Sequence, residues 1–318
     1  MKLGCAVGCF TYPHYSAPYE DAIRKAGDMG FDGIELIVSE IADLTEYYTP
    51  ARLRSLRELI AGYGMEVSEL ILYACVVQGF SGRDEARKQR SLDMLKRGIE
   101  IAQSFGTDKI NMVSNWPDTL TAPISYPPCY FHPNVNGVER YEPKLKLGLP
   151  RRYDAQGEWE NYIESLRRAV TVCEAEGMML CLEGHANVII GSTDGFLRAC
   201  DWIESDAFCT NFDTAWQLVQ REYLPWSIYK LGDRIRHVHV RDGDGMLCYT
   251  LPPGQGIIDW HGLVRALDEV GYDGYLSFEL GGMLEPSRCV QEGYDYLLQV
   301  LLDEKLYTGK GGMACSRR

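Results

Sequence analysis

Short apolar runs alternate with longer amphipathic segments along the whole chain. The short runs are mostly apolar rather than strictly alternating, which is typical of parallel strands covered on both faces. Eight of them are expected to form strands, at residues 2–10, 33–38, 66–73, 108–114, 178–184, 208–214, 236–242 and 274–280. Helices are predicted at 18–30, 50–64, 84–106, 158–177 and 259–271. Several of these helical segments close on a glycine, which readily adopts the left-handed backbone of a helix end.

Eight strands that alternate with helices predict an α/β fold, a closed (β/α)8 TIM barrel that forms a single domain over residues 1–318. The alternative is an open doubly wound sheet, which would normally carry a glycine-rich phosphate loop after an early strand. The stretch "GQGIID" matches such a loop only in part, and it follows the seventh strand. The closed barrel is therefore favoured.

One connection is much longer than the others. After the fourth strand, an insertion at about 115–157 is rich in Pro, Tyr and Asn and shows no helical periodicity. Long loops of this kind in a compact domain usually serve binding or catalysis. Trp116 is therefore expected to form part of an aromatic wall for a substrate. The alternative is a surface insertion or a subunit contact.

Composition and charge exclude several classes of partner. The net charge is −13 and the sequence pI is about 5.0, so nucleic acid and membrane surfaces are not expected partners. No apolar run reaches the roughly eighteen residues of a membrane-spanning helix. The 11 cysteines are scattered, odd in number and placed mostly in apolar runs, which indicates free thiols and a cytoplasmic location. They show no finger spacing, so a structural zinc site is not expected.

Four consecutive strands each carry one possible metal ligand near the C-terminal end, where the active sites of such barrels lie. These residues are Glu183, Asp213, His239 and Glu279. Neighbouring parallel strands lie about 4.8 Å apart, so the four side chains can converge on one point. Three carboxylates packed together would repel one another, and a divalent cation removes that repulsion. Each residue alone has a simpler explanation, such as a helix cap for Asp213, but four coincidences on adjacent strands are harder to explain. Mn²⁺ is the favoured ion, with Mg²⁺, Co²⁺ or Zn²⁺ as alternatives.

Two further histidines lie close to these positions in the sequence. His237 precedes His239 by two residues, so it should share its face one layer deeper, as an interior residue or a supporting partner. His185 follows Glu183 by two residues, and it could contact substrate, orient Glu183 or form a loop hydrogen bond.

The motifs "FDGIEL", "LEGH", "FDTAW", "HVHVRD", "PPGQGIIDW" and "SFEL" together resemble those of the xylose isomerase-like TIM barrels, the sugar phosphate isomerase and epimerase superfamily. The resemblance covers about residues 3–303. It implies that Glu183, Asp213, His239 and Glu279 are the metal ligands. It also implies that Gly254, Gly256 and Asp259 shape the turn into the helix after the seventh strand.

The sequence departs from the D-tagatose 3-epimerase type at two positions. Trp216 stands where a histidine often follows the metal aspartate, and Ile189 and Ile190 stand where a further glutamate is expected. Contacts to the sugar must therefore differ from those of that enzyme type. Substrate contacts are expected from His185, Trp116, Trp216 and Arg241.

The resemblance implies chemistry beside a carbonyl group, as in a metal-dependent sugar isomerase or epimerase that forms an enediolate. Glu183 and Glu279 would then remove and return the proton. The alternative is a lyase that eliminates the aglycone from a 3-oxo-glycoside, as in C-glycoside deglycosidases, with His132 as a candidate base and a small β-subunit as partner. Otherwise a homo-oligomer is expected. An apurinic endonuclease-like enzyme is disfavoured, because the chain has only 6 histidines and a net charge of −13.

Overall fold

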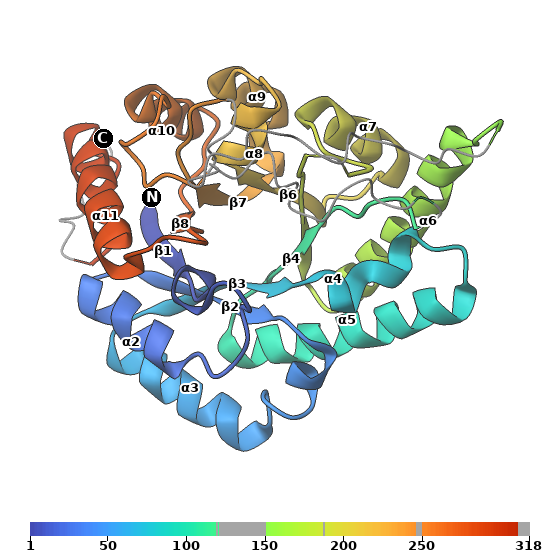
Figure 1. The fold of residues 1–318 in the computed structure, drawn as a ribbon, viewed down its shortest axis with the longest axis horizontal. Coiled ribbons are helices and arrows are strands. Elements are labelled where there is room, and N and C mark those ends of the chain that lie inside the picture. Colours follow the sequence, from blue (N-terminus) through green and yellow to red (C-terminus); the bar gives the residue numbers. More distant parts are fainter. Residues whose placement is uncertain (119, 121–150, 187, 246–249, 311–318) are drawn as a thin grey trace, which may run out of the picture.

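The structure is a computed structural model of the chain, and it describes residues 1–118, 120, 151–186, 188–245 and 250–310. Eight parallel strands close into a barrel in chain order, with the last strand paired to the first (Figure 1). The strands are β1 (Lys2–Ala6), β2 (Gly33–Val38), β3 (Glu66–Leu72), β4 (Lys109–Val113), β5 (Met179–Glu183), β6 (Phe208–Asp213), β7 (Ile235–Val240) and β8 (Tyr275–Phe278). This confirms the predicted (β/α)8 barrel.

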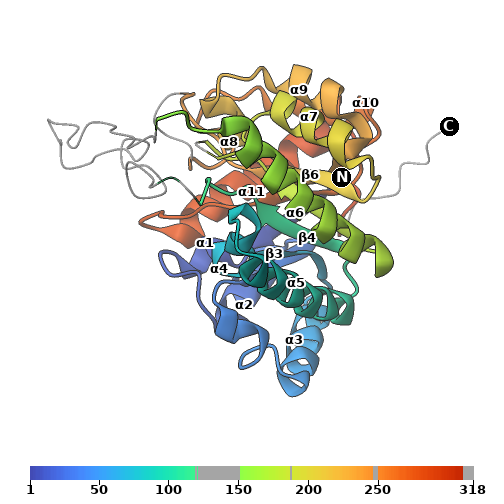
Figure 2. The ribbon, with the colours of Figure 1, turned by 90° about the vertical axis from the view of Figure 1, so that its right-hand side faces the viewer.

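Helices surround the barrel and cover its outer face, as the two ribbon views show (Figures 1 and 2). The α-helices are α1 (Gly8–Thr11), α2 (Glu20–Met29), α3 (Pro50–Gly62), α4 (Ala74–Val77), α5 (Glu85–Phe105), α6 (Ala155–Ala175), α7 (Thr193–Ile203), α8 (Thr214–Val219), α9 (Leu224–Leu231), α10 (Trp260–Glu269) and α11 (Pro286–Asp303). Short 3-10 helices are η1 (Ile41–Leu44), η2 (Gln78–Ser81) and η4 (Gly232–Arg234). None of the helices in the described ranges is long and apolar enough to cross a bilayer.

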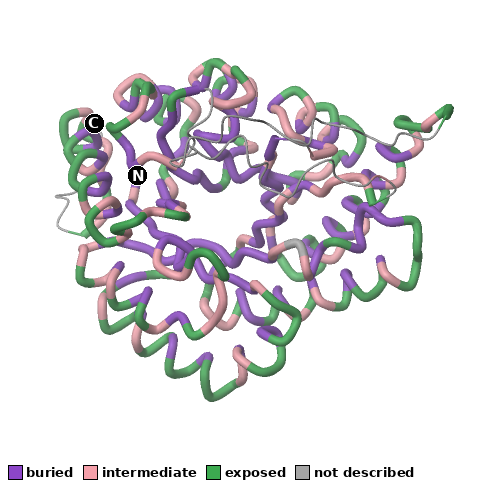
Figure 3. The backbone as a smooth tube through the Cα atoms, in the orientation of Figure 1, coloured by how far each residue is buried: buried purple, intermediate pink, exposed green. Residues whose placement is uncertain are grey.

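The strands are buried on both faces, which explains why their sequences do not alternate. All six residues of β2 and all six of β6 are buried, and the strands form the buried inner ring in Figure 3. The predicted glycine ends also occur: Gly30 after α2 and Gly106 after α5 have φ values of +95° and +80°. The cysteines in the described ranges are free, as expected.

The first strand is shorter than predicted. It ends at Ala6, and residues 8–11 form α1 instead of continuing the strand. The backbone turns at Val7, which has helical angles of φ −56° and ψ −23°. The thiol of Cys9 then donates a hydrogen bond to the carbonyl of Phe278 at 3.2 Å. The apolar pattern of residues 2–10 therefore continues into a buried turn at the end of the barrel.

The loop between β7 and α10 is built around the carboxylate of Asp242, which is fully buried. This carboxylate accepts hydrogen bonds from the backbone N–H groups of Gly243, Gly254 and Ile258 and from the indole of Trp260. A Cβ atom on Gly256 would lie 2.1 Å from Oδ1 of Asp242, so only glycine fits there. Asp259 caps α10 by accepting a hydrogen bond from Gly262, and the motif "PPGQGIIDW" thus shapes this turn.

Candidate metal centre

The structure brings together the four ligands predicted at the strand ends. One donor atom from each of Glu183, Asp213, His239 and Glu279 lies within 4.8 Å of the others. Nδ1 of His239 lies 3.2 Å from Oε2 of Glu183, 3.3 Å from Oε2 of Glu279 and 3.9 Å from Oδ2 of Asp213. We call these four residues the outer quartet.

The strand register explains why the quartet converges. Asp213 is the last residue of β6 and is paired with His239 of β7, while Glu183 ends β5. Asp213 also caps α8, because its Oδ1 accepts a hydrogen bond from the N–H of Trp216 at 2.7 Å. Its Oδ2 remains directed at the quartet, so capping and metal binding would use different oxygens.

Arg241 lies against the quartet and is 6% exposed. Its Nε donates to Oδ2 of Asp213 at 2.9 Å, and its Nη2 contacts Asp213 and lies 3.3 Å from Oε2 of Glu279. Burial lowers the pKa of the guanidinium, but the carboxylates of Asp213, Glu279 and Glu183 together raise it above its ordinary value. Arg241 is therefore a fixed positive charge beside three carboxylates, whether or not it also contacts substrate.

The two glutamates of the quartet have opposite pKa shifts. Burial raises the pKa of Glu183 to about 7, and the nearby Glu279 charge adds to the rise although His239 opposes it. Burial would also raise the pKa of Glu279, but Arg241 and His239 lower it to about 2. Burial raises the pKa of Asp213 despite the Arg241 charge. Unequal carboxyl groups of this kind suit an acid and a base at one site.

His185 holds the other oxygen of Glu183. Its Nε2 lies 2.7 Å from Oε1 of Glu183, and its ring stacks on Trp216 with the centroids 4.5 Å apart. Burial and the Arg241 charge lower the pKa of His185 well below its ordinary value. The Trp216 ring also lies beneath Arg241 at 5.3 Å and is 2% exposed. Trp216 therefore packs behind the polar residues and fixes their positions.

The quartet fits a divalent ion by its spacing and its charge. Bonds of about 2.0–2.2 Å around one ion place adjacent ligand atoms about 3 Å apart and opposite ones about 4.4 Å apart. The distances of 3.2–3.9 Å from His239 lie in that range. Nδ1 of His239 and Oε2 of Glu279 are buried and have no hydrogen-bond partner among the described residues. Three carboxylates, one guanidinium and a dication sum to zero charge.

Comparison with known proteins places the chain in a family. Residues 23–300 match the family described as xylose isomerase-like TIM barrel. The chain belongs to the xylose isomerase-like TIM barrel family.

Relatives of this xylose isomerase-like barrel carry the names of sugar epimerases. The chain is 26% identical over 281 residues to fructoselysine 3-epimerase from Shigella flexneri, covering 86% of this chain and 89% of that protein. It is 22% identical over 268 residues to D-psicose 3-epimerase from Ruminiclostridium cellulolyticum, covering 83% and 79%. These relatives support the prediction of an enzyme that acts as a sugar isomerase or epimerase.

Solved structures share the fold. A D-psicose 3-epimerase from Clostridium cellulolyticum superposes with a TM-score of 0.72 at 18% identity, covering 95% of this chain and 99% of that one. A 3-keto-D-glucoside 4-epimerase from E. coli gives a TM-score of 0.68 at 18% identity, covering 94% and 99%. At this identity the superpositions show the common barrel alone.

Two predicted site residues of this xylose isomerase-like barrel lie in the insertion after β4. Trp116 is half-buried at the start of the insertion, and its indole donates to the carbonyl of Leu120 at 3.0 Å. His132 lies outside the described residues. A substrate contact by Trp116 and a catalytic role for His132 stay predictions.

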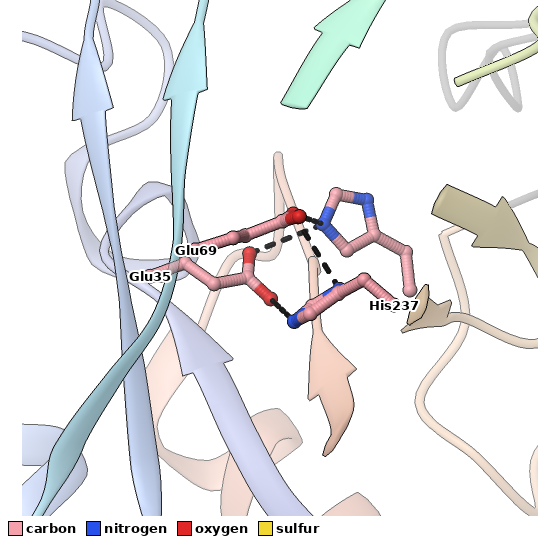
Figure 4. A group of neighbouring side chains, drawn as sticks. Glu35, Glu69 and His237 are labelled. Carbon is pink, nitrogen blue, oxygen red and sulfur yellow. Dashed lines mark hydrogen bonds and ion pairs between the residues drawn. The ribbon is translucent and has the colours of Figure 1, made fainter. Parts of the chain in front are cut away.

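A second polar layer lies beneath the outer quartet of this xylose isomerase-like barrel, and its two glutamates were not predicted from the sequence. Glu35 of β2 and Glu69 of β3 point across the barrel at His237 of β7 (Figure 4). Nε2 of His237 lies 3.3 Å from Oε1 of Glu35, and its Nδ1 lies 3.4 Å from Oε1 of Glu69. His237 thus lies one layer deeper than His239, as predicted. The available signal was an acidic residue inside each of the apolar runs "GIELIV" and "EVSELIL".

The pKa of each histidine follows from its neighbours. Burial lowers the pKa of His237 to about 3, although Glu69 partly opposes the shift. Burial also acts to lower the pKa of His239, but Glu35, Glu183 and Glu279 together raise it well above its ordinary value. Of these two histidines, His239 is therefore the one that carries positive charge when no metal is bound.

Proposed function

We propose that the protein is a divalent-metal-dependent isomerase or epimerase of a keto-sugar or sugar derivative that reacts through an enediolate. The observation that carries this proposal is the convergence of Glu183, Asp213, His239 and Glu279 at the C-terminal ends of four successive strands. The epimerase names of the relatives support the reaction class. Mixed oxygen and nitrogen donors suit Mn²⁺, with Mg²⁺, Co²⁺ or Zn²⁺ as alternatives.

The proposed reaction moves a proton on the substrate, and different residues of the site contribute to different parts of that step. A C–H group beside a carbonyl is a weak acid, and a divalent ion held by the quartet would stabilise the negative charge that forms on the neighbouring oxygens. Glu183 ends β5 and Glu279 directly follows β8, so the two lie on either side of Asp213 and His239, and one can remove the proton while the other returns it. Return to a neighbouring carbon gives an isomer, and return to the same carbon from the other side gives an epimer.

Neighbouring residues orient the carboxylates of Glu183 and Glu279 and place a positive charge beside them. His185 holds one oxygen of Glu183 at 2.7 Å and leaves the other directed at the quartet. Arg241 supplies a buried positive charge 3.3 Å from Glu279, where it would stabilise an anionic substrate oxygen. Because Ile189 and Trp216 replace polar residues of the D-tagatose 3-epimerase type, the sugar contacts of this protein should differ from those enzymes.

Exchange of substrate C–H for deuterium tests this function directly. The Mn²⁺-loaded protein is mixed with a panel of ketoses and 3-oxo-glycosides in D₂O, and the loss of proton signals is followed by NMR. We expect exchange beside the carbonyl, with Glu183→Gln and His239→Ala abolishing it. Glu158→Gln is a matched control, because Glu158 is also buried but pairs with Arg83 at 2.8 Å.

Different outcomes separate the alternatives. Exchange with recovery of an isomeric sugar supports the proposal, whereas release of a phenolic product identifies the lyase. Normal turnover in either Glu183→Gln or His239→Ala contradicts the assignment of the site.

A further inference from the structure

Two glutamates form a buried pair on the wall of the barrel opposite β7. Glu35 of β2 and Glu69 of β3 are register partners, placed level by a shift in strand pairing between Ile34 and Glu35. Both side chains have no exposed surface. We call Glu35 and Glu69 the inner pair.

The imidazole of His239 lies between the inner pair and the three carboxylates of the outer quartet. Its Nε2 is 3.1 Å from Oε2 of Glu35 and 3.2 Å from Oε1 of Glu69. Its Nδ1 is 3.2 Å from Oε2 of Glu183 and 3.3 Å from Oε2 of Glu279. Each nitrogen of one ring therefore faces a different pair of carboxylates.

The two nitrogens would have different roles once an ion is bound, because only Nδ1 faces the other residues of the outer quartet. A histidine binds a metal through the lone pair of one nitrogen, while the other nitrogen keeps its proton and donates it to a neighbour. Only carboxylate oxygens meet Nε2 among the described residues, so a proton on Nε2 has two acceptors. Nδ1 then presents its lone pair to the quartet.

We propose that Glu35 and Glu69 are positioning residues that keep the proton of His239 on Nε2, so that Nδ1 is the metal ligand. This inference rests on the proposed function, because it takes the outer quartet as the metal site. The inner pair acts through His239 and touches neither substrate nor ion.

Neighbouring side chains hold the inner pair in place. The amide of Asn111 donates to Oε1 of Glu69 at 3.1 Å. His237 spans the gap between the two glutamates (Figure 4), and its Nδ1 lies 3.3 Å from Oδ1 of Asn211. These contacts come from three strands, β4, β6 and β7, and leave the carboxylates little freedom to turn away from His239.

A purely structural role explains the inner pair poorly. Apolar side chains fill most of the interior of such barrels, and they avoid the cost of removing two carboxylates from water. Oε2 of Glu69 is buried without a hydrogen-bond partner among the described residues, so the site is not optimised for stability alone. The geometry is instead that of carboxylates that orient a metal-binding histidine.

The first test uses NMR to determine which nitrogen of His239 carries the proton in the unaltered protein. Zn²⁺ is used as a diamagnetic probe, the histidines are labelled with ¹⁵N, and the His239 signals are identified by their absence in His239→Ala. We expect a protonated Nε2 and a zinc-bound Nδ1. A protonated Nδ1 with zinc on Nε2 overturns the proposal.

The second test measures Zn²⁺ affinity by competition with a chelator. Glu35→Gln and Glu69→Gln should each weaken binding by about 10- to 100-fold, the usual effect of removing a partner of a metal ligand. Glu158→Gln, which alters a buried glutamate paired with Arg83, should leave the affinity unchanged. The visible spectrum of bound Co²⁺ should change in both inner-pair variants, which a loss of packing alone would not produce.

The remaining outcomes are also decisive. Unchanged affinity in both inner-pair variants overturns the proposal. Two zinc ions per chain, one of them lost in Glu69→Gln, also overturn it, because the inner pair would then itself bind metal. Failure of the proposed function gives a different result. If the outer quartet is not the metal site, Asp213→Asn will keep full zinc binding.

Discussion

Replacing Arg241 with methionine should make the stability of the protein depend on a divalent ion. The Arg241 guanidinium is the only side-chain cation besides His239 that the structure places against the three carboxylates of the quartet, within the residues it describes. Methionine fills a similar volume but removes the charge, and Asp213 and Glu279 then lose a buried partner. Removing one member of a buried ion pair typically costs about 3–5 kcal/mol.

The ion should reduce this loss. An ion that binds only the folded state stabilises it by about 2.7 kcal/mol at a hundred times its dissociation constant. Because Arg241 repels a cation at the quartet, Arg241→Met should bind the ion more tightly than the unaltered protein. The gap in the free energy of unfolding between the two proteins should therefore narrow when Mn²⁺ is added.

The assay is urea unfolding of both proteins, once with a chelator and once with excess Mn²⁺. Arg288→Met is the matched control, because Arg288 is exposed and pairs with Glu285 and Glu292 on the surface. It should change stability by no more than about 0.5 kcal/mol in either condition. A loss below about 1 kcal/mol for Arg241→Met in chelator, or a gap that Mn²⁺ does not narrow, refutes the reasoning.

Two further predictions concern the pH dependence of the site and the loop beside it. Lowering the pH below about 7 should weaken Mn²⁺ binding, because protons then occupy Glu183, whose pKa is about 7, in addition to His239, whose pKa is raised. Calorimetry should show affinity falling by about tenfold per pH unit for each displaced proton, and an affinity that stays constant between about pH 6 and about pH 8 contradicts this. Asp242→Ala should destabilise the protein by at least about 2 kcal/mol, because Trp260 and three backbone N–H groups lose their acceptor. An unchanged urea midpoint would show that this loop does not depend on the carboxylate.

The barrel could be predicted because its signal is local and repeated. Each strand is a short apolar run, and each long helix has its own periodicity and a recognisable end, as at Gly30 and Gly106. The end of β1 was predicted wrongly because residues 8–10 are apolar in both a strand and a buried turn. The apolar pattern of residues 8–10 indicates that they are buried, but it does not indicate whether their backbone is a strand or a turn.

The outer quartet could be predicted because neighbouring parallel strands end together. That rule brings Glu183, Asp213 and His239 close without knowledge of any long-range contact. The inner pair required more, because Glu35 meets His239 across the barrel, 204 positions apart in the chain. Such a contact depends on closure of the sheet and on the register shift beside Glu35. Neither of these can be predicted from a local sequence pattern.

The contacts of Arg241 could also not be predicted from the sequence. The sequence predicted Arg241 only as a substrate contact, because no local pattern indicates which carboxylate a buried arginine will meet. The structure shows the contact with Asp213. A substrate contact by Arg241 stays a prediction.

Anomalous diffraction from a crystal soaked in Mn²⁺ tests the central claim most directly. We expect one strong anomalous peak at about 2.0–2.2 Å from donor atoms of Glu183, Asp213, His239 and Glu279, with Nδ1 of His239 facing it. A map without a peak among these four residues, or with its only peak elsewhere in the protein, would contradict the account.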